Sequence, residues 1–396
     1  MRRPATLLAA TLLVAGCGDD DPSIDPGVFE ARTLTFPSDV PEVCDGPCVV
    51  QDLPDVDGES VHIFVVGDMG LDTDGGHQAE VAAGVRKACG QRTGGCAAGL
   101  FLGDNLYDAG LDDAADEARF TRMLDRYPSV PKYLVMGNHD WRKVLPSRER
   151  AWNEITYLAE REDTHSAHFF TARVGPVRLL GLDTNYLVRS RHGVDQVREH
   201  PISAALDDPT AAWSVSFGHH PFLSTGPHGN AGSYRDTVGN SGWRGKAFAE
   251  YLREDLLVAS DLYLAGHEHS MQFYPPVERL IGPDLTIEPA PLAATAVVGS
   301  SAKSSGPGDA DVCAEGATRS LFEFYGYGFA VLSADEETLA LTLFEEDGDP
   351  LWAVTRQRDE AWVAPAWKGP FCGRPTPNPP KASPEPRSAQ VDKRPG

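Results

Sequence analysis

A repeated local pattern constrains the fold of this chain more than any other feature of its sequence. Six times a short apolar run ends in glycine and is followed by polar residues, in VHIFVVGDMG, GLFLGDNLY, KYLVMGNHD, VRLLGLDTN, WSVSFGHHP and LYLAGHEH. Each run has the length and the β-branched or aromatic content of a buried strand, and helical patterns at 113–127 and 245–257 lie between some of them. We therefore expect an α/β core with the polar clusters at the carboxyl edge of a sheet, where such folds carry their sites.

The carboxyl-terminal part of the chain has a different pattern. The segments TAVVGSS, FAVLSADEETLALTLFEED and LWAVTRQR have the composition of antiparallel strands joined by tight turns. A second sheet packed on the first is the economical way to bury them, so the predicted architecture is a two-sheet β-sandwich with helices.

The two ends of the chain predict export and a membrane anchor. Residues 1–16 carry two arginines and then a short apolar run, which is typical of a secretory signal, and VAGC at 14–17 resembles a bacterial lipobox. In that case Cys17 is lipidated and holds the protein on a bacterial membrane, facing the periplasm or the cell surface. An ordinary cleaved signal is the alternative. We expect a tether at 17–57, a catalytic domain at 58–372 and a disordered Pro-rich tail at 373–396.

The net charge and the cysteine content indicate which partners the protein can bind and which cellular compartment it occupies. The formal net charge of −23 argues against nucleic acid as a partner. Besides Cys17 there are six cysteines, an even number that suggests disulfides in an exported chain, and none has C-x-x-C spacing. Cys89 and Cys96 flank a short Gly-rich turn and could close a local loop, but the sequence does not choose among the possible pairings.

The polar residues at the strand ends suit a metal site. Carboxylates, an amide and imidazoles form a mixed oxygen and nitrogen set of the kind that binds divalent or trivalent transition metals. Five of the twelve histidines belong to the last two clusters. The full set is Asp68, Asp104, Tyr107, Asn138, His139, Asp140, His219, His220, His228, His267 and His269.

In this order, GDMG, GDNLY, GNHD, GHHPFLSTGPHG and GHEH resemble the five motifs of calcineurin-like metallophosphoesterases, and specifically those of purple acid phosphatases of the small, tartrate-resistant type. The resemblance covers most of residues 60–358. Most relatives outside the purple branch have a histidine two residues after the first aspartate, where this chain has Gly70, and the purple branch has a tyrosine in the place of Tyr107. The resemblance implies an αββα fold, and an acid phosphatase that cleaves phosphomonoesters with a dinuclear Fe(III)–M(II) centre and a metal-bound hydroxide nucleophile.

The resemblance also implies a role for each site residue. It makes Asp104 the bridging ligand, and it leaves iron, zinc and manganese open for the second ion. His139, with Asp140 as a possible orienting carboxylate, and His228 match outer histidines that hold the phosphate and protonate the leaving oxygen. The implied iron(III) ligands are Asp68, Tyr107 and His269, and the implied ligands of the divalent ion are Asn138, His219 and His267.

Other functions remain open at this stage. The same scaffold could serve a phosphodiesterase or a pyrophosphatase, because substrate selection lies in loops. A non-catalytic surface binding protein that kept the fold, or a redox role for an iron pair, are further alternatives. The expected partners are a small phosphate ester or a phosphoprotein, and a membrane through Cys17. Neither the oligomeric state nor the physiological ester follows from the sequence.

Overall fold

All six apolar runs form strands, as predicted. Their side chains are nearly all buried, because each strand packs against the opposing sheet on one face and against helices on the other. These strands are β2 (Val61–Val66), β3 (Ala98–Phe101), β4 (Lys132–Leu134), β7 (Val177–Leu182), β8 (Trp213–Gly218) and β9 (Leu262–Ala265).

The fold is that of a computed structural model. It describes residues 42–44, 48–72, 77–142, 147–190, 192–229, 231, 245–276, 292–307 and 320–369. All of these belong to the second of the chain's two units, Pro37–Gly396. The predicted signal at 1–16, Cys17 and the tail at 373–396 lie outside the described residues. Within the described part, no helix is long and apolar enough to cross a membrane.

The first sheet has the strand order β1-β6-β7-β8-β9-β11-β10-β12. Strands β7, β8, β9 and β11 run parallel to one another, whereas β10 is antiparallel to both of its neighbours. The other strands of this sheet are β1 (Gln51–Asp52), β6 (Phe169–Val174), β10 (Met271–Tyr274), β11 (Ala294–Val298) and β12 (Phe322–Phe324).

The second sheet has the order β16-β15-β14-β13-β2-β3-β4-β5. Strands β2 to β5 are parallel, and β13 joins them by pairing antiparallel with β2, with Leu332 opposite Ile63. The remaining strands are β5 (Thr164–Ser166), β13 (Gly328–Ala334), β14 (Thr338–Glu345), β15 (Pro350–Gln357) and β16 (Trp362–Val363).

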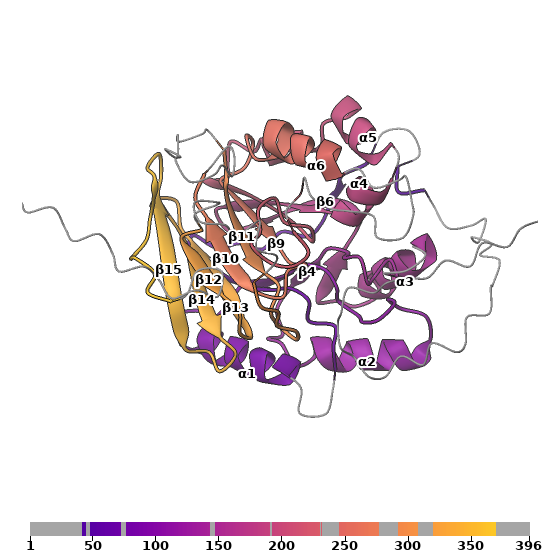
Figure 1. Cartoon of the computed structure of the whole chain (residues 1–396), viewed down its shortest axis with the longest axis horizontal. Helices are drawn as coiled ribbons and strands as arrows, with labels where there is room; N and C mark the ends of the chain where they lie inside the picture. The colour runs from indigo at the N-terminus through magenta and orange to yellow at the C-terminus, as the bar shows by residue number, and fades with distance from the viewer. Residues whose placement is uncertain are drawn as a thin grey trace, which may run out of the picture. The chain divides into compact units, whose positions relative to one another are not determined.

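This topology confirms the predicted two-sheet sandwich. It corrects the prediction of which strands belong to which sheet. The TAVV segment forms β11 in the first sheet, and the later hairpins extend the sheet that contains β2 instead of forming a sheet of their own. The polar-ended parallel strands are therefore divided between the sheets, with β2, β3 and β4 in one and β7, β8 and β9 in the other. Figure 1 labels one of these strands from each sheet, β4 and β9.

Three apolar clusters make up the layers. One lies between the sheets, a second joins α4, α5 and α6 to the first sheet, and a third joins α1, α2 and α3 to the second sheet. The predicted helices at 113–127 and 245–257 are present, the former beginning after Asp113, whose carboxylate accepts from the backbone of Ala115 and Asp116. The helices are α1 (His77–Gly90), α2 (Ala114–Leu124), α3 (Arg148–Ala159), α4 (Thr184–Arg189), α5 (Gly193–Glu199) and α6 (Gly245–Tyr251), with shorter turns η1 (Ile202–Leu206) and η2 (Leu252–Leu256).

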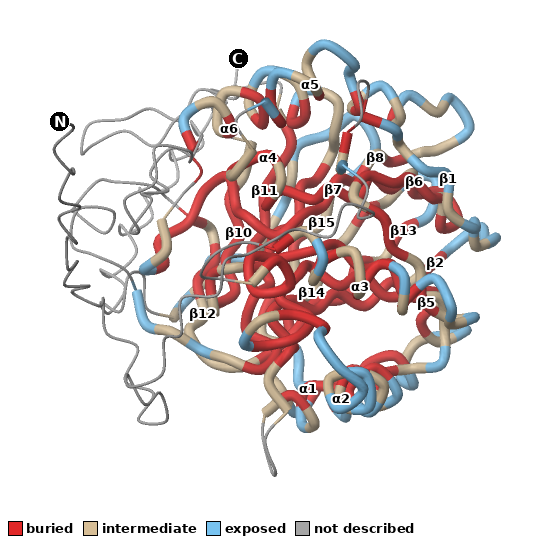
Figure 2. The backbone as a smooth tube through the Cα atoms, turned by 90° about the vertical axis from the view of Figure 1, so that its right-hand side faces the viewer, coloured by how far each residue is buried: buried red, intermediate tan, exposed pale blue. Residues whose placement is uncertain are grey.

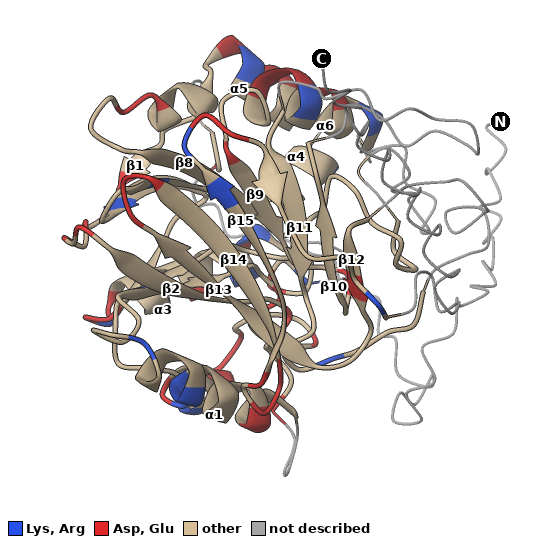
Figure 3. Cartoon of the chain, turned by 90° about the vertical axis from the view of Figure 1, so that its left-hand side faces the viewer, with Lys and Arg blue, Asp and Glu red and all other residues tan. Residues whose placement is uncertain are grey.

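The figures show what this layering does to the surface. The strands at the centre of the fold are buried, and most exposed residues lie in loops, in edge strands such as β1 and on the outer sides of helices such as α1 and α2 (Figure 2). Charged residues of both signs lie mostly on helices and connecting loops, and few occur on the strands (Figure 3).

The segment before β2 is more than the predicted tether. Within it, β1 pairs with β6, Val56 donates to the Arg173 carbonyl at 2.8 Å, and Tyr133 donates its hydroxyl to the Pro54 carbonyl at 2.5 Å. The part of 17–57 that the structure describes therefore belongs to the folded domain, because it covers a sheet edge that would otherwise be unpaired.

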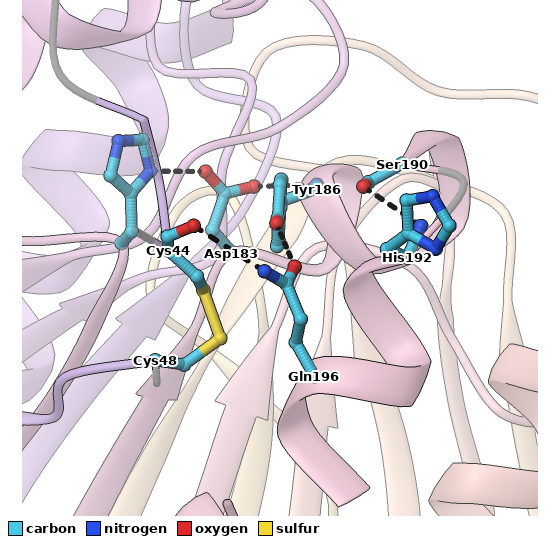
Figure 4. The surroundings of a disulfide bond; sticks show 8 residues. Cys44, Cys48, Asp183, Tyr186, Ser190, His192 and Gln196 are labelled. Carbon is cyan, nitrogen blue, oxygen red and sulfur yellow. Dashed lines mark hydrogen bonds and ion pairs between the residues drawn. A yellow bond between two sulfur atoms is a disulfide. The ribbon is translucent and has the colours of Figure 1, made fainter. Parts of the chain in front are cut away.

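Two disulfides join neighbouring cysteines. Cys89 pairs with Cys96, as the Gly-rich turn suggested, and Cys44 pairs with Cys48. The carbonyl of Cys44 accepts from Gln196, which in turn accepts from the Tyr186 hydroxyl on α4 (Figure 4). The segment around Cys44 is thereby connected to α4 and α5 on the first sheet. Cys313 and Cys372 lie outside the described residues.

Candidate metal centre

The carboxyl edges of the two sheets meet at one place. Asp68, Asp104 and Asn138 follow β2, β3 and β4, while His219 follows β8, and His267 and His269 follow β9. A hydrogen bond joins the two sheets there: the backbone N–H of His267 donates to Asp68 Oδ2 at 2.8 Å. The site therefore lies between the sheets, and each sheet contributes about half of its side chains.

Three residues of this edge have a backbone conformation that side chains rarely adopt. The φ angles of Asp68, Asp104 and His267 are 56°, 50° and 71°. None of these residues is a glycine, so each conformation is strained and is maintained by the surrounding structure. Such strain clusters at functional sites, where it aims side chains that a relaxed strand end would direct elsewhere.

Tyr107 lies in contact with two of the predicted ligands. Its hydroxyl donates to Asp68 Oδ1 at 3.1 Å and lies 3.4 Å from His269 Nε2, and His269 Nε2 is 3.6 Å from Asp68 Oδ1. Burial, together with the charge of Asp104, raises the pKa of both Asp68 and Tyr107. A buried cation would reverse this effect by favouring both anions.

Gly70 shows why a histidine cannot occupy its position in this chain. A Cβ at Gly70 would lie 2.5 Å from the backbone nitrogen of Leu106 and 2.7 Å from the carbonyl carbon of Asn105. Tyr107 N–H also donates to the Gly70 carbonyl at 3.1 Å. The close approach that positions Tyr107 therefore leaves no room for a side chain at position 70.

A second group of possible metal-ligand atoms lies around His219. Its Nδ1–H donates to the Leu102 carbonyl at 2.9 Å, so Nε2 carries the lone pair. That lone pair faces Asn138 Oδ1 at 3.0 Å and Asp104 Oδ1 at 3.4 Å, which are also acceptors, and His267 Nδ1 lies 3.1 Å away. Acceptors this close repel one another unless a cation lies among them, so the donor set fits a bound metal ion. Asp68, Asp104 and His219 place ligand atoms within 4.8 Å of one another.

The electrostatics of the imidazoles agree with this arrangement. Burial lowers the pKa of His219, and burial with the neighbouring histidines lowers the pKa of His267 and His269 well below its usual value. The rings are therefore neutral near pH 7, and the neutral ring is the form that binds metal. Burial opposes ionisation of Asp104, but His219 and His139 lower its pKa below the usual range.

Asp140 does not have the orienting role expected from the sequence. Its Oδ1 accepts from the backbone of Asn105 and Leu106 at 2.8 and 3.1 Å, and its Oδ2 accepts from Gly137 N–H at 2.7 Å. His139 instead donates from Nδ1 to the carbonyl of Asp108 at 2.8 Å. Asp140 therefore ties the loop after β3 to the loop after β4. Burial, with the charge of Asp104, raises its pKa to about 8.

His228 lies beside two of the predicted metal ligands. Its ring centroid is 4.8 Å from that of His267 and 5.4 Å from that of His269. His220 is buried behind them, with Nδ1 3.0 Å from Thr184 Oγ1 and its ring 4.7 Å from that of His267. His220 therefore packs against His267, one of the predicted ligands.

Sequence reasoning missed two charged residues at the site. Glu268, between the two β9 histidines, is fully buried with Oε2 3.3 Å from His228 Nδ1, and Lys303 lies with Nζ 3.9 Å from the centre of the Tyr107 ring. The loop that carries Lys303 is bound to the site at both ends, since Ser301 N–H donates to Gly67 and Ser305 N–H to His269. Glu268 was visible in GHEH, but no sequence signal indicated its partner.

Comparisons with known proteins agree with this geometry. A model of the calcineurin-like phosphoesterase family matches residues 61–271. Purple acid phosphatase 4 of Arabidopsis thaliana is 29% identical over 195 residues, which cover 44% of this chain and 52% of that protein. The chain spans about half the length of the curated relatives it matches.

Two solved structures share the fold. The first is GAP50, described as the anchor in the inner membrane complex of Plasmodium, with a TM-score of 0.54 and 17% identity over 77% of this chain and 90% of that one. The second is purple acid phosphatase PPD1 from yellow lupin (Lupinus luteus) seeds, with a TM-score of 0.53 and 18% identity over 76% of this chain and 54% of that one. At such identities the likeness concerns the fold alone.

Proposed function

Since this chain belongs to the calcineurin-like phosphoesterase family, we propose that it is an exported hydrolase of phosphomonoesters with a dinuclear centre of iron(III) and a divalent metal. The observation that carries the proposal is the contact of the buried Tyr107 hydroxyl with Asp68 and His269. A phenolate is a hard anionic oxygen that suits a hard trivalent ion, and Gly70 leaves no room for the alternative histidine.

The ligand set divides into two groups that share Asp104. Asp68, Tyr107 and His269 would hold iron(III), and Asn138, His219 and His267 would hold iron(II), zinc or manganese. When bound, a pair of such ions supplies the nucleophile from water and neutralises charge that develops on the phosphoryl group. The protein contributes the placement of these donors, because the strained backbone at Asp68, Asp104 and His267 fixes their directions before any ion arrives.

Outside this ligand set, two histidines would act on the substrate. His139 donates Nδ1–H to the Asp108 carbonyl, so its Nε2 would donate to a phosphate oxygen when the ring carries a second proton. His228 would donate a proton to the leaving oxygen as its bond to phosphorus breaks. A histidine with an ordinary pKa of about 6.5 carries that proton only on the acid side of neutrality, so we expect hydrolysis to be fastest at mildly acidic pH.

Metal analysis, the visible spectrum and phosphatase assays on the purified protein test this function. We expect one tightly bound iron per chain, a second metal, a violet to pink colour and hydrolysis of phosphomonoesters. A colourless protein with two zinc ions and no iron would contradict the iron assignment. A metal-loaded protein that cleaves diesters faster than monoesters would favour the phosphodiesterase alternative.

A non-catalytic role is the second candidate, because a chain described as an anchor shares this fold. The complete donor set argues against it, since nothing in a scaffold role requires acceptors to face one another within 3.4 Å. Metal binding without any phosphoester hydrolysis would favour that candidate.

Export and anchoring form a separate part of the proposal. The Cys44–Cys48 and Cys89–Cys96 disulfides support an oxidising compartment outside the cytoplasm. We propose that Cys17 carries the lipid that holds the protein on the membrane.

A further inference from the structure

Glu268 is a buried carboxylate whose one described hydrogen-bond partner, His228, lies in the loop after the neighbouring strand β8. Its side chain is completely buried, and Oε2 lies 3.3 Å from Nδ1 of His228. Its Oε1 has no hydrogen-bond partner among the described residues. A carboxylate is costly to bury, and it is retained in proteins where it is paired or does chemical work.

We propose that Glu268 is a positioning residue for His228, an inference that rests on the proposed hydrolase function. The carboxylate accepts the Nδ1–H of His228 and so selects the tautomer and the orientation of the ring. With Nδ1–H held by Glu268, the ring acts on a substrate through Nε2. As the bond from phosphorus to the leaving oxygen breaks, its electron pair stays on that oxygen, which takes the Nε2 proton, while Nδ1 keeps its own.

The loop that carries His228 is shaped to admit this carboxylate. A Cβ at Gly226 would lie 2.0 Å from Glu268 Oε2 and 2.5 Å from its Cδ. Gly226 precedes His228 by two residues, and its own N–H donates to Ser224 Oγ at 2.8 Å. The glycine is therefore needed for the close approach of the carboxylate to the loop that carries His228.

Both partners are fixed to the same strand. Thr225 in the loop donates from its backbone nitrogen to Oε1 of Gln272 on β10 at 2.9 Å, and Gln272 donates to Ser270 Oγ at 2.8 Å. Ser270 directly follows His269, so β10 holds the loop at one end and Glu268 at the other. Their separation is set by the fold, as a positioning contact requires.

The experiment compares Glu268→Gln with His228→Ala in the full metal-loaded protein on two substrates. One is an alkyl phosphate, whose leaving oxygen needs a proton, and the other is 4-nitrophenyl phosphate, whose leaving group departs without one. For Glu268→Gln we expect kcat on the alkyl ester to fall about 10- to 100-fold, the usual effect of removing a group that orients a functional histidine. The loss on the nitrophenyl ester should be much smaller.

Two further variants distinguish positioning from a general structural effect. In the double variant Glu268→Gln with His228→Ala, kcat on the alkyl ester should fall no further than in His228→Ala alone, because both changes remove the same function. Glu323→Gln is the matched control, since Glu323 is equally buried but its carboxylate accepts from the Ser320 and Tyr325 hydroxyls. It should leave the ratio of the two substrate rates unchanged.

Three outcomes would overturn the inference while the wild type remains an active metalloenzyme. They are equal losses on both esters in Glu268→Gln, losses that add to those of His228→Ala, and loss of metal or of the visible band. If Glu268→Gln does not fold, Gly226→Ala gives the same test, because its methyl group displaces the carboxylate and should reproduce the same substrate dependence. A wild type without hydrolase activity would instead refute the proposed function.

Discussion

Replacing Tyr107 with phenylalanine tests the proposed centre with the smallest possible change. The ring is 1% exposed, and it lies 3.9 Å from Lys303 Nζ and 4.3 Å from the His139 ring. Phenylalanine keeps all of these ring contacts and creates no large cavity. Only the hydroxyl is lost, and with it the 3.1 Å hydrogen bond to Asp68.

The expected effects differ between the metal-free and the iron-loaded protein. Without metal, losing one buried hydrogen bond should lower the free energy of unfolding by about 1 kcal/mol. With iron, Tyr107→Phe should abolish the visible band, because the colour arises from charge transfer from the phenolate to iron(III). It should also weaken iron retention during dialysis.

Urea unfolding of the metal-free protein and the visible spectrum of the iron-loaded protein measure the two effects. Tyr133→Phe is the matched control, because its buried ring also loses one hydroxyl hydrogen bond, in this case to the Pro54 carbonyl and not to a predicted metal ligand. It should cost a similar free energy and leave the colour unchanged. A Tyr107→Phe protein that keeps the band, or holds iron as tightly as Tyr133→Phe does, would refute the assignment of Tyr107 as a ligand.

Three other changes have defined outcomes. Removing the metal with a chelator should lower the stability of the protein. Metal added back at about 100 times its dissociation constant should restore about 2.7 kcal/mol. Thermal unfolding with and without metal measures the difference. Replacing both Cys89 and Cys96 with serine opens a loop with a sequence separation of 7. The free energy of unfolding, measured in urea, should fall by roughly 2 kcal/mol. An unchanged free energy would mean that the disulfide does not constrain the unfolded chain. Cys17→Ser should move the protein from the membrane fraction to the soluble fraction after cell lysis, and a variant that still sediments with membranes would contradict lipid anchoring at this residue.

The elements that carry the site could be predicted from the sequence because their signals are local. An apolar run with a polar end identifies a strand and its functional edge without knowledge of the neighbouring strands, so β2, β3, β4, β8 and β9 were all predicted. The residue types at those ends, together with Gly70 and Tyr107, also indicated the chemistry, because ligand preference depends on the donor atoms.

The tertiary structure decided which groups far apart in the sequence meet. Strand pairing depends on the whole set of competing partners, so the sequence did not reveal that the later hairpins extend the β2 sheet or that the site draws on both sheets. The same reason explains Asp140, whose carboxylate binds the backbone of another loop, and Glu268, whose contact with His228 joins residues 40 positions apart. Such contacts depend on how distant segments pack together, and a local sequence pattern does not predict that packing.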